Sequence, residues 1–198
     1  MRIRVATVGD AAAVAAIYRP YVDASVISFE ADPPDEAEMA RRIGKILETH
    51  PWLVFEDRGR VLGYAYATEH SPRAAYRWAA NVSVYVHQDV HRRGVGRNLY
   101  GVLFKLLRVQ GSINAYAGIT LPNPKSVGLH EAIGFRPVGV YERVGFKFGA
   151  WHDVGWWQMA LQPSPRVPPA PRRWPDVSDR DESRQALAAG VAAISAPR

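Results

Sequence analysis

The sequence predicts a mixed α/β domain over residues 1–162, followed by a proline-rich tail with a short helix over residues 163–198. Two observations indicate this class. Short segments rich in β-branched and aromatic residues alternate with segments whose apolar residues recur every three or four positions. The composition is ordinary for a globular protein, since 47% of the 198 residues are hydrophobic and 22% are charged. A chain of this length can bury one core.

The first half of the chain alternates strands with helices. Asp10 is predicted to cap a helix that continues to Tyr18, and Pro20 is expected to disturb this helix because proline lacks an amide hydrogen. Asp57-Arg58-Gly59 predicts the turn of a hairpin. In order, the predicted elements are a strand at 3–6, a helix at 10–18 with a further turn to about residue 24, a helix from about 35 to 47, and hairpin strands at 53–56 and 60–68.

The second half contains the strongest strand and helix patterns. Asn81–Val86 carries β-branched and aromatic residues at period two, which predicts a strand. Residues 94–109 predict a long helix, because their apolar side chains recur at spacings of three and four. The remaining predicted elements are a strand at 113–119, a helix at 123–133, and strands at 136–147 and 151–161.

The tail begins after Leu161. Residues 163–171 are rich in proline and are expected to be extended. The alanine-rich segment 181–194 predicts a short helix, and Ser178 is its candidate cap. Gly190 weakens the prediction of this helix. Two alternatives remain, an arm packed against the domain or a dimer partner, and a mobile tail.

A basic, glycine-containing loop at residues 91–97 joins the strand at 81–86 to the long helix. A helix N-terminus presents unpaired N–H groups and the positive end of the helix dipole. Gly94 and Gly96 let the backbone approach a ligand closely, and the neighbouring arginines add positive charge. The loop therefore predicts a site for a phosphate or pyrophosphate. It has neither the Gly-Lys-Ser/Thr ending of triphosphate loops nor the Gly-x-Gly-x-x-Gly of dinucleotide folds.

A second segment, Leu121–Phe135, opens a predicted helix at Asn123 and ends it at Gly134. Together the two segments resemble the acetyl-CoA-binding halves of the GNAT acetyltransferase superfamily, and they are similar above all to its phosphinothricin N-acetyltransferase branch. The resemblance covers residues 2–161 and implies the GNAT fold, a central mixed and mostly antiparallel sheet with helices on both faces. The segments that resemble the branch are Ser28-Phe29-Glu30, Pro51–Val54, Arg73–Trp78, Ser83–Val86, Leu129-His130-Glu131 and Gly149–Trp156.

The resemblance implies an N-acetyltransferase that uses acetyl-CoA and needs no metal. The pyrophosphate of acetyl-CoA would lie on the loop at 91–97, and its pantetheine arm along Val84–Val86. The residues implied to bind acetyl-CoA are Val84, Tyr85, Val86, Arg92, Arg93, Gly94, Val95, Gly96, Arg97, Asn123 and Ser126. The residues implied to take part in catalysis are His130, Asn81 and Tyr85.

The chain departs from the branch at Asn81, where the resemblance implies a glutamate that acts as general base. An amide cannot accept a proton at neutral pH, although it can orient a water molecule or hydrogen-bond an amine. Three alternatives follow: His130 takes the proton, the amine arrives neutral, or turnover is slow. A histidine titrates near neutral pH and can donate or accept a proton.

The resemblance places the acceptor pocket at Phe29, Arg73, Tyr76, Tyr85 and Val154. Arginine pairs with a carboxylate or phosphinate through two parallel hydrogen bonds, and aromatic walls suit a small amino acid. Phe29 and Tyr76 can equally be core residues, and Arg73 a solvated loop residue. We expect N-acetylation of a small amino acid of the phosphinothricin or methionine sulfoximine type. The alternatives are acetylation of another small amine, and a CoA-binding protein with low turnover.

The composition argues against several other classes. Without cysteine there is no disulfide, thiolate zinc site or acetyl-cysteine intermediate. The sequence has no apolar run of about 18 residues and no apolar signal region at its start, so we expect a cytoplasmic protein without membrane contact. The net charge is +6, but its spread along the chain disfavours nucleic-acid binding. The branch implies a homodimer, formed through Trp151–Trp157 and the proline arm.

Overall fold

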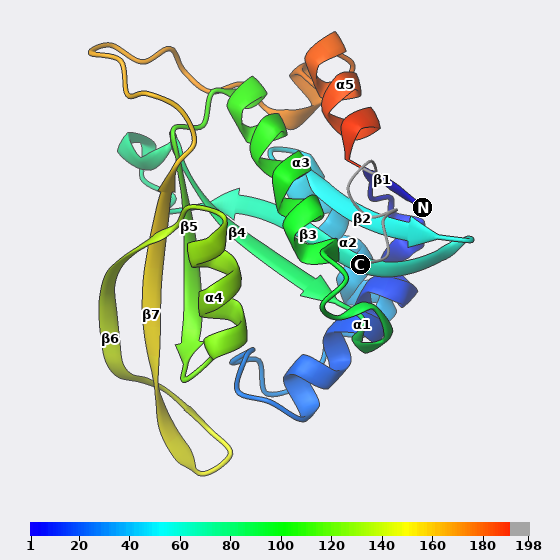
Figure 1. Cartoon of the computed structure of the whole chain (residues 1–198), viewed down its shortest axis with the longest axis vertical. Coiled ribbons are helices and arrows are strands. Elements are labelled where there is room, and N and C mark those ends of the chain that lie inside the picture. Colours follow the sequence, from blue (N-terminus) through cyan, green and yellow to red (C-terminus); the bar gives the residue numbers. More distant parts are fainter. Residues whose placement is uncertain (191–198) are drawn as a thin grey trace.

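The computed structural model of the protein describes residues 1–190, which fold around a mixed sheet of seven strands (Figure 1). The strand order is β1-β2-β3-β4-β5-β7-β6, and in this part of the chain all neighbours are antiparallel except β4 and β5. The strands are β1 (Arg2–Val5), β2 (Trp52–Asp57), β3 (Arg60–Glu69), β4 (Ala79–Val86), β5 (Asn114–Leu121), β6 (Arg136–Lys147) and β7 (Ala150–Ala160). The α-helices are α1 (Ala11–Asp23), α2 (Glu36–Leu47), α3 (Val95–Gln110), α4 (Pro124–Ala132) and α5 (Asp181–Ala189).

Helices cover both faces of the sheet, because its strands alternate their side chains between two cores. In β2, Trp52 and Val54 belong to the core formed with α1 and α2, whereas Leu53 and Phe55 belong to the larger core under α3. This alternation is the period of two that a strand imposes. The predicted α/β class, with a mostly antiparallel mixed sheet and helices on both faces, is confirmed.

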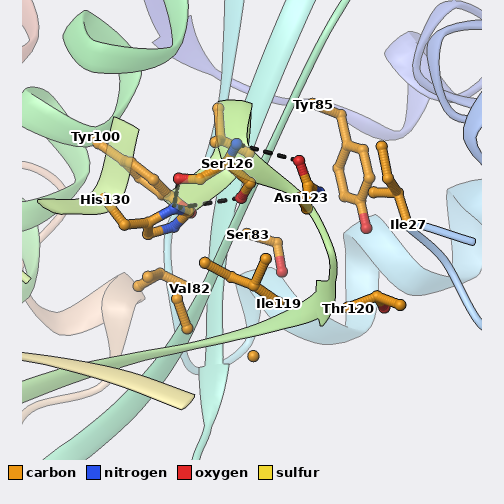
Figure 2. Close-up of a pocket in the computed structure, with 13 residues that line it drawn as sticks. Ile27, Val82, Ser83, Tyr85, Tyr100, Ile119, Thr120, Asn123, Ser126 and His130 are labelled. Atoms are coloured by element: carbon orange, nitrogen blue, oxygen red, sulfur yellow. Dashed lines mark hydrogen bonds between the residues drawn. The ribbon is translucent and has the colours of Figure 1, made fainter. Parts of the chain in front are cut away.

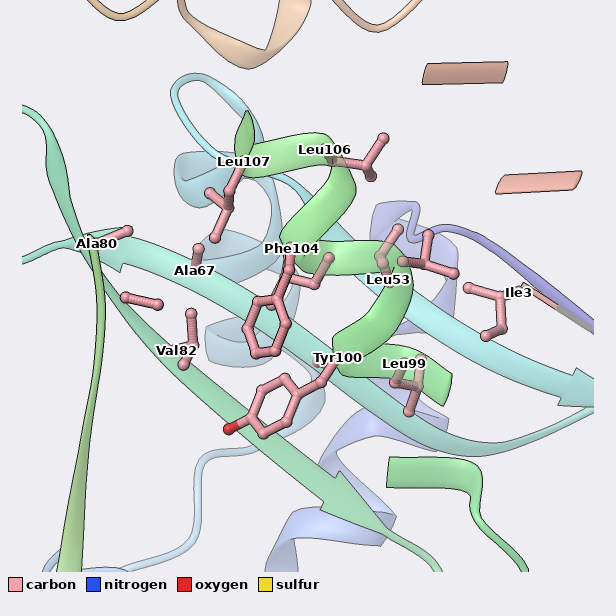
Figure 3. Packing of buried hydrophobic residues seen from close by; sticks show 14 of the residues in the cluster. Ile3, Leu53, Ala67, Ala80, Val82, Leu99, Tyr100, Phe104, Leu106 and Leu107 are labelled. Carbon is pink, nitrogen blue, oxygen red and sulfur yellow. The ribbon is translucent and has the colours of Figure 1, made fainter. Parts of the chain in front are cut away.

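Helix α3 lies at the centre of the larger core (Figure 3). Leu99, Leu103, Leu106 and Leu107 have no exposed surface. Their spacings of one, three and four residues put them on one side of the helix, against the sheet. The helix ends at Gly111, whose φ of 97° is favourable for glycine and strained for other residues.

The expected disturbance at Pro20 is wrong, because α1 continues through this proline to Asp23. Val22, two residues further on, has no exposed surface, so burial of its side chain favours the helical path. The amide of Ala24 donates to the Pro20 carbonyl at 3.1 Å and closes the last turn. Tertiary packing here outweighs the local preference of proline.

The predicted side-chain cap at Asp10 is also wrong. Its carboxylate accepts hydrogen bonds from the Arg4 guanidinium at 2.7 and 2.8 Å and from the Thr7 amide at 2.8 Å, and it makes no bond to the first amides of α1. A charged donor is the stronger partner for a carboxylate. The hydrogen bond from Arg4 is the main reason that the pKa of Asp10 is lowered.

The described part of the tail packs on the domain. Trp174 and Val177 are buried in the larger core, and the amide of Arg172 donates to the Gln110 carbonyl at the end of α3. Helix α5 begins at Asp181 and lies beside α3, so Ser178 does not cap it; the Ser178 hydroxyl donates to the Pro175 carbonyl instead. Predicted helical residues beyond 190 lie outside the described residues.

One of the tryptophans assigned to a dimer surface lies in the core. Trp157 is 6% exposed and belongs to the core under α3, whereas Trp151 is 60% exposed. Trp151 lies at the hairpin end of β7, where only β6 pairs with it, whereas Trp157 lies in the part of β7 that pairs with both β5 and β6. Over residues 1–190, no helix has the length and apolar character that crossing a membrane requires.

Candidate active site

The candidate site is a cleft lined by residues of β4 and β5. It lies where these two strands separate (Figure 1). The two strands pair only at residues 79–81 and 114–116. Further along, β4 pairs only with β3 as far as Val86, and β5 only with β7 as far as Leu121. The facing backbone edges therefore lack ladder partners, and such edges can bind an extended ligand through main-chain hydrogen bonds.

Both separated strands, helices α3 and α4, and the loop after α1 contribute to the walls of this cleft (Figure 2). The lining residues are Ile27, Val82, Ser83, Val84, Tyr85, Tyr100, Ala117, Gly118, Ile119, Thr120, Asn123, Ser126 and His130. Val82 and Val84 of β4 pack with the core under α3, while Tyr85 packs with the core of α1 and α2. The cleft therefore passes between residues of the two faces of the sheet.

Helix α4 begins at the cleft because of a local cap. The Asn123 side chain accepts a hydrogen bond from the Ser126 amide at 3.1 Å, and Pro124 occupies the first turn, where no amide hydrogen is needed. One turn after Ser126, the side chain of His130 lines the same wall of the cleft (Figure 2).

His130 is buried and both of its ring nitrogens have protein partners. Nδ1 lies 2.8 Å from the Ser126 carbonyl oxygen, which can only accept, so we assign the hydrogen to Nδ1. Nε2 lies 3.1 Å from the Tyr100 hydroxyl and accepts its hydrogen. Burial lowers the pKa of His130, which favours the neutral ring. The same burial raises the pKa of the Tyr100 hydroxyl.

The basic loop forms the N-terminus of α3, as its sequence predicts. Gly94 is the N-cap residue with a φ of 76°, and Arg92 also has a positive φ of 63°. The first helical hydrogen bond is donated by the Asn98 amide to the Gly94 carbonyl. The amides of residues 95–97 precede it and have no helical acceptor, which is the arrangement that binds anions.

The loop arginines differ in their surroundings. Arg92 and Arg93 are exposed, and neither forms an ion pair with another described residue. Arg97 donates to the Ala132 carbonyl at 3.1 Å and thereby ties α3 to α4. His91, at the start of the loop, lies 2.9 Å from the carbonyl oxygen of Val86.

Tyr85 lies among aromatic rings on the other face of the sheet. Its ring packs edge-on against Tyr18 and Tyr21 at centroid distances of 4.9 and 5.1 Å and stacks on Tyr64 at 5.3 Å. Burial raises the pKa of the Tyr85 hydroxyl well above its ordinary value, so this phenol stays protonated. A protonated phenol can donate a hydrogen bond.

The residues assigned to the acceptor pocket are spread around this face. The Phe29 ring covers Gly145 of β6, where a Cβ atom would overlap it, and lies beside His152. Val154 of β7 pairs with Thr120, a lining residue of the cleft. Arg73 is exposed, and among residues 1–190 its side chain has no hydrogen bond or ion pair.

Asn81 has a partner that the sequence analysis missed. Its Oδ1 lies 2.8 Å from Nδ1 of His70, the residue that follows β3. Tyr76 lies near the same imidazole, with ring centroids 5.7 Å apart. The two residues of the pair are eleven positions apart, so no helical or strand spacing links them. Only the register of β3 with β4, which pairs Thr68 with Asn81, indicates that the residue after β3 will be close.

Comparison with known proteins identifies the family. The family described as "Acetyltransferase (GNAT) domain" matches residues 3–156. The phosphinothricin N-acetyltransferase of Streptomyces viridochromogenes is 40% identical over 172 residues, which cover 86% of this chain and 94% of that protein. The L-methionine sulfoximine/L-methionine sulfone acetyltransferase of Pseudomonas paraeruginosa is 34% identical over 84% of this chain and 98% of that protein.

A solved structure agrees with this assignment. The crystal structure of a GNAT superfamily phosphinothricin acetyltransferase from Sinorhizobium meliloti in complex with AcCoA superimposes with a TM-score of 0.81 at 34% identity, and covers 88% of this chain and 96% of that chain. The chain belongs to the GNAT acetyltransferase family, and within it to the phosphinothricin N-acetyltransferase branch.

Proposed function

We propose that the protein transfers the acetyl group of acetyl-CoA to the amine of a small amino acid of the phosphinothricin or methionine sulfoximine type. The observation that carries the proposal is the cleft between β4 and β5, which has the α3 N-terminus on one side and aromatic residues on the other. A thioester and an amine can meet there from opposite faces of the sheet. The printed names of the two relatives support the acceptor class.

The residues around the loop suit acetyl-CoA. When bound, acetyl-CoA supplies an activated acyl group and a thiol leaving group. In the proposal the free amides of residues 95–97, with Arg92 and Arg93, hold the diphosphate, and the unpaired edge of residues 84–86 binds the pantetheine arm. A Cβ atom at Gly96 would lie 3.5–3.7 Å from the side chains of Leu129, Val84 and Val86. Glycine at this position therefore leaves the surface beside these side chains open to a ligand.

His130 is proposed to act on the acetyl-CoA side, at the wall that α4 forms. Its ring packs against Phe135 and Tyr100 in the core under α3, away from the aromatic acceptor face. Asn123 and Ser126 hold the start of the same helix. We expect His130→Ala to lower kcat by about 10²–10⁴-fold, the usual effect of removing a group that exchanges protons in catalysis.

The acceptor is proposed to bind on the Tyr85 face, with Phe29, Tyr76 and Val154 as walls and Arg73 pairing with its acidic group. Arg73 is exposed and has no acidic partner among residues 1–190, so its guanidinium is free to bind a carboxylate or phosphinate. Arg73→Gln should raise KM for such an acceptor more than it lowers kcat.

Thiol release from acetyl-CoA tests the function across a panel that includes phosphinothricin, methionine sulfoximine and amines without an acidic group. Turnover confined to the amino acids is expected. Matched panel members whose amine is already acetylated serve as controls, because they cannot accept a second acetyl group from this reaction. Turnover only with amines that lack an acidic group would favour the alternative acceptor. Acetyl-CoA binding without turnover on any member would favour a CoA-binding protein with low turnover.

We also propose that the protein forms a homodimer through β6 and the β6–β7 hairpin. β6 is the edge strand of the sheet, and this region exposes half or more of each of its large apolar side chains. These residues are Val138, Val140, Tyr141, Val144, Phe146, Phe148 and Trp151. An apolar surface on an open edge is typical of an interface, and a second copy would cover both the surface and the edge.

Light scattering tests the dimer. Phe146→Glu is expected to convert it to a monomer, because the charge would be buried at the interface. Val8→Glu is the control, since Val8 is 59% exposed and lies just after β1, the strand at the other edge of the sheet. A wild-type protein that is monomeric at micromolar concentration would exclude the proposed interface.

A further inference from the structure

We propose that His70 is the base that takes the proton from the ammonium group of the acceptor, and that Asn81 positions it. The inference rests on the proposed function and adds a catalytic residue to it. It starts from the contact between His70 Nδ1 and Asn81 Oδ1, at 2.8 Å. His70 thus lies beside the position at which the branch glutamate was expected.

The hydrogen bonds around Asn81 determine which nitrogen of His70 is basic. The Asn81 Nδ2 group donates to the Glu69 carbonyl at 3.4 Å, which sets the orientation of the amide. Its Oδ1 can then only accept, so His70 Nδ1 carries the hydrogen. The neutral ring has its lone pair on Nε2, and among residues 1–190 this nitrogen has no hydrogen-bond partner. Asn81 therefore selects the tautomer with a free basic Nε2.

The surroundings place this imidazole at the end of the cleft. Asn81 is the last residue of β4 that pairs with β5, and the cleft opens directly after it. The ring of Trp156 lies 6.1 Å from the His70 ring, and the same indole packs against Gly118, which lines the cleft. His70 is half-buried, so it remains accessible to a small acceptor.

The elements packed against His70 bring no charge to it. Tyr76 faces the ring from the turn after residue 73, and Tyr116 faces it from β5 at a centroid distance of 4.5 Å. These two phenols are the titratable groups in contact with the ring, and Trp156 of β7 and Asn81 of β4 are neutral. Within residues 1–190 no carboxylate pairs with His70, so the imidazole itself is the group that can accept a proton.

Other candidate bases have partners that commit them elsewhere. Ser126 and Tyr100 hold both nitrogens of His130 on the acetyl-CoA side, where its proposed proton exchange would serve the leaving thiol and not the ammonium group. The Glu30 carboxylate forms an ion pair with Arg42 at 2.7 Å. His70 Nε2, in contrast, has no hydrogen-bond partner in the part of the chain that the structure describes.

The proton balance is complete with this assignment. The acceptor ammonium gives one proton to His70 Nε2, and the amine lone pair then forms the new C–N bond to the acetyl carbon. The C–S bond of the thioester breaks with its electrons on sulfur, and the second amine proton ends on the thiol. His70 releases its proton to solvent before the next turnover.

The test compares His70→Phe and His70→Asn with wild type in kcat/KM as a function of pH. Phenylalanine keeps aromatic packing against Tyr116 without a base, and asparagine keeps a donor toward Asn81 without one. Both should lower kcat/KM by roughly 10²-fold near neutral pH. If His70 must be neutral to act as the base, wild type should show an acid limb in this profile and a plateau above it. Both variants should instead rise with pH throughout, because solvent must supply the base.

A structural role predicts a different result. It would lower the rate by the same factor at every pH, and that outcome, or unchanged activity in both variants, would overturn the proposal. His50→Gln is the control, since His50 lies outside the cleft and its nearest partner is Thr49. Circular dichroism and acetyl-CoA calorimetry verify that each variant folds and binds. In a further arm, free imidazole should restore part of the activity of His70→Ala in a saturable way.

The test distinguishes failure of the proposed function from failure of the proposed role of His70. Failure of the function would show as no thiol release by wild type with any acceptor, and the role of His70 would fall with it. An active wild type whose His70 variants keep its pH profile would overturn the role of His70 alone.

Discussion

At the scale of single residues, His130 couples folding to pH. Burial lowers its pKa, so the folded protein favours the neutral ring, whereas the unfolded chain takes up the proton near the ordinary value of about 6.5. Below that pH the unfolded state binds more protons, so the free energy of unfolding should fall as the pH falls. Urea unfolding at about pH 7.5 and about pH 5 should show a larger loss in wild type than in His130→Gln. Burial also lowers the pKa of His50. His50 is present in both proteins, so its contribution to the pH dependence cancels in the comparison. Equal losses would contradict the prediction.

Asn81 offers a second prediction at this scale. In Asn81→Glu a carboxylate would face the Nδ1 hydrogen of His70 and stabilise the protonated ring. The acid limb of kcat/KM should then move to higher pH, while Asn81→Ala should lower the plateau without such a move. Steady-state kinetics across the pH range measures both. A limb that stays in place in Asn81→Glu would mean that His70 does not titrate in the reaction.

At the scale of elements, the α3 N-terminus depends on Gly94. Its φ of 76° is strained for valine by roughly 1–2 kcal/mol, and the added side chain would crowd the free amides of residues 95–97. Gly94→Val should weaken acetyl-CoA binding at least about tenfold, or about 1.4 kcal/mol, by calorimetry. Gly101→Ala is the matched control, because that position on α3 has open space around it. Undiminished affinity in Gly94→Val would place the diphosphate elsewhere.

The elements themselves were largely predictable. The apolar spacing of α3 and the period of β4 are local patterns, and the structure reproduces both within a few residues. The path of α1 through Pro20 was not predictable, because it follows from the burial of Val22 in a core that α1 shares with segments far away in the sequence. The connection after β3 carried no pattern that separated His70 from an ordinary loop residue.

At the scale of the whole molecule, the tail contributes to stability. Trp174 is 4% exposed in the core under α3, and Val177 has no exposed surface. Trp174→Ala should lower the free energy of unfolding by about 3–5 kcal/mol, the usual cost of emptying such a site. Urea unfolding measures the loss. Val167→Ala should have almost no effect, since Val167 is 83% exposed. Equal stability of the two variants would show that the tail packs too weakly to matter.

The order of strands and helices, the capped start of α4 and the glycine-containing start of α3 could be predicted from the sequence, because each depends on residues adjacent in the chain. Tertiary structure decided which tryptophan of β7 is buried, where the tail lies and which side chain faces Asn81. Those outcomes depend on strand register and on contacts between distant segments. The pairing of β3 with β4 brings His70 to Asn81, and the separation of β4 from β5 opens the cleft beside them.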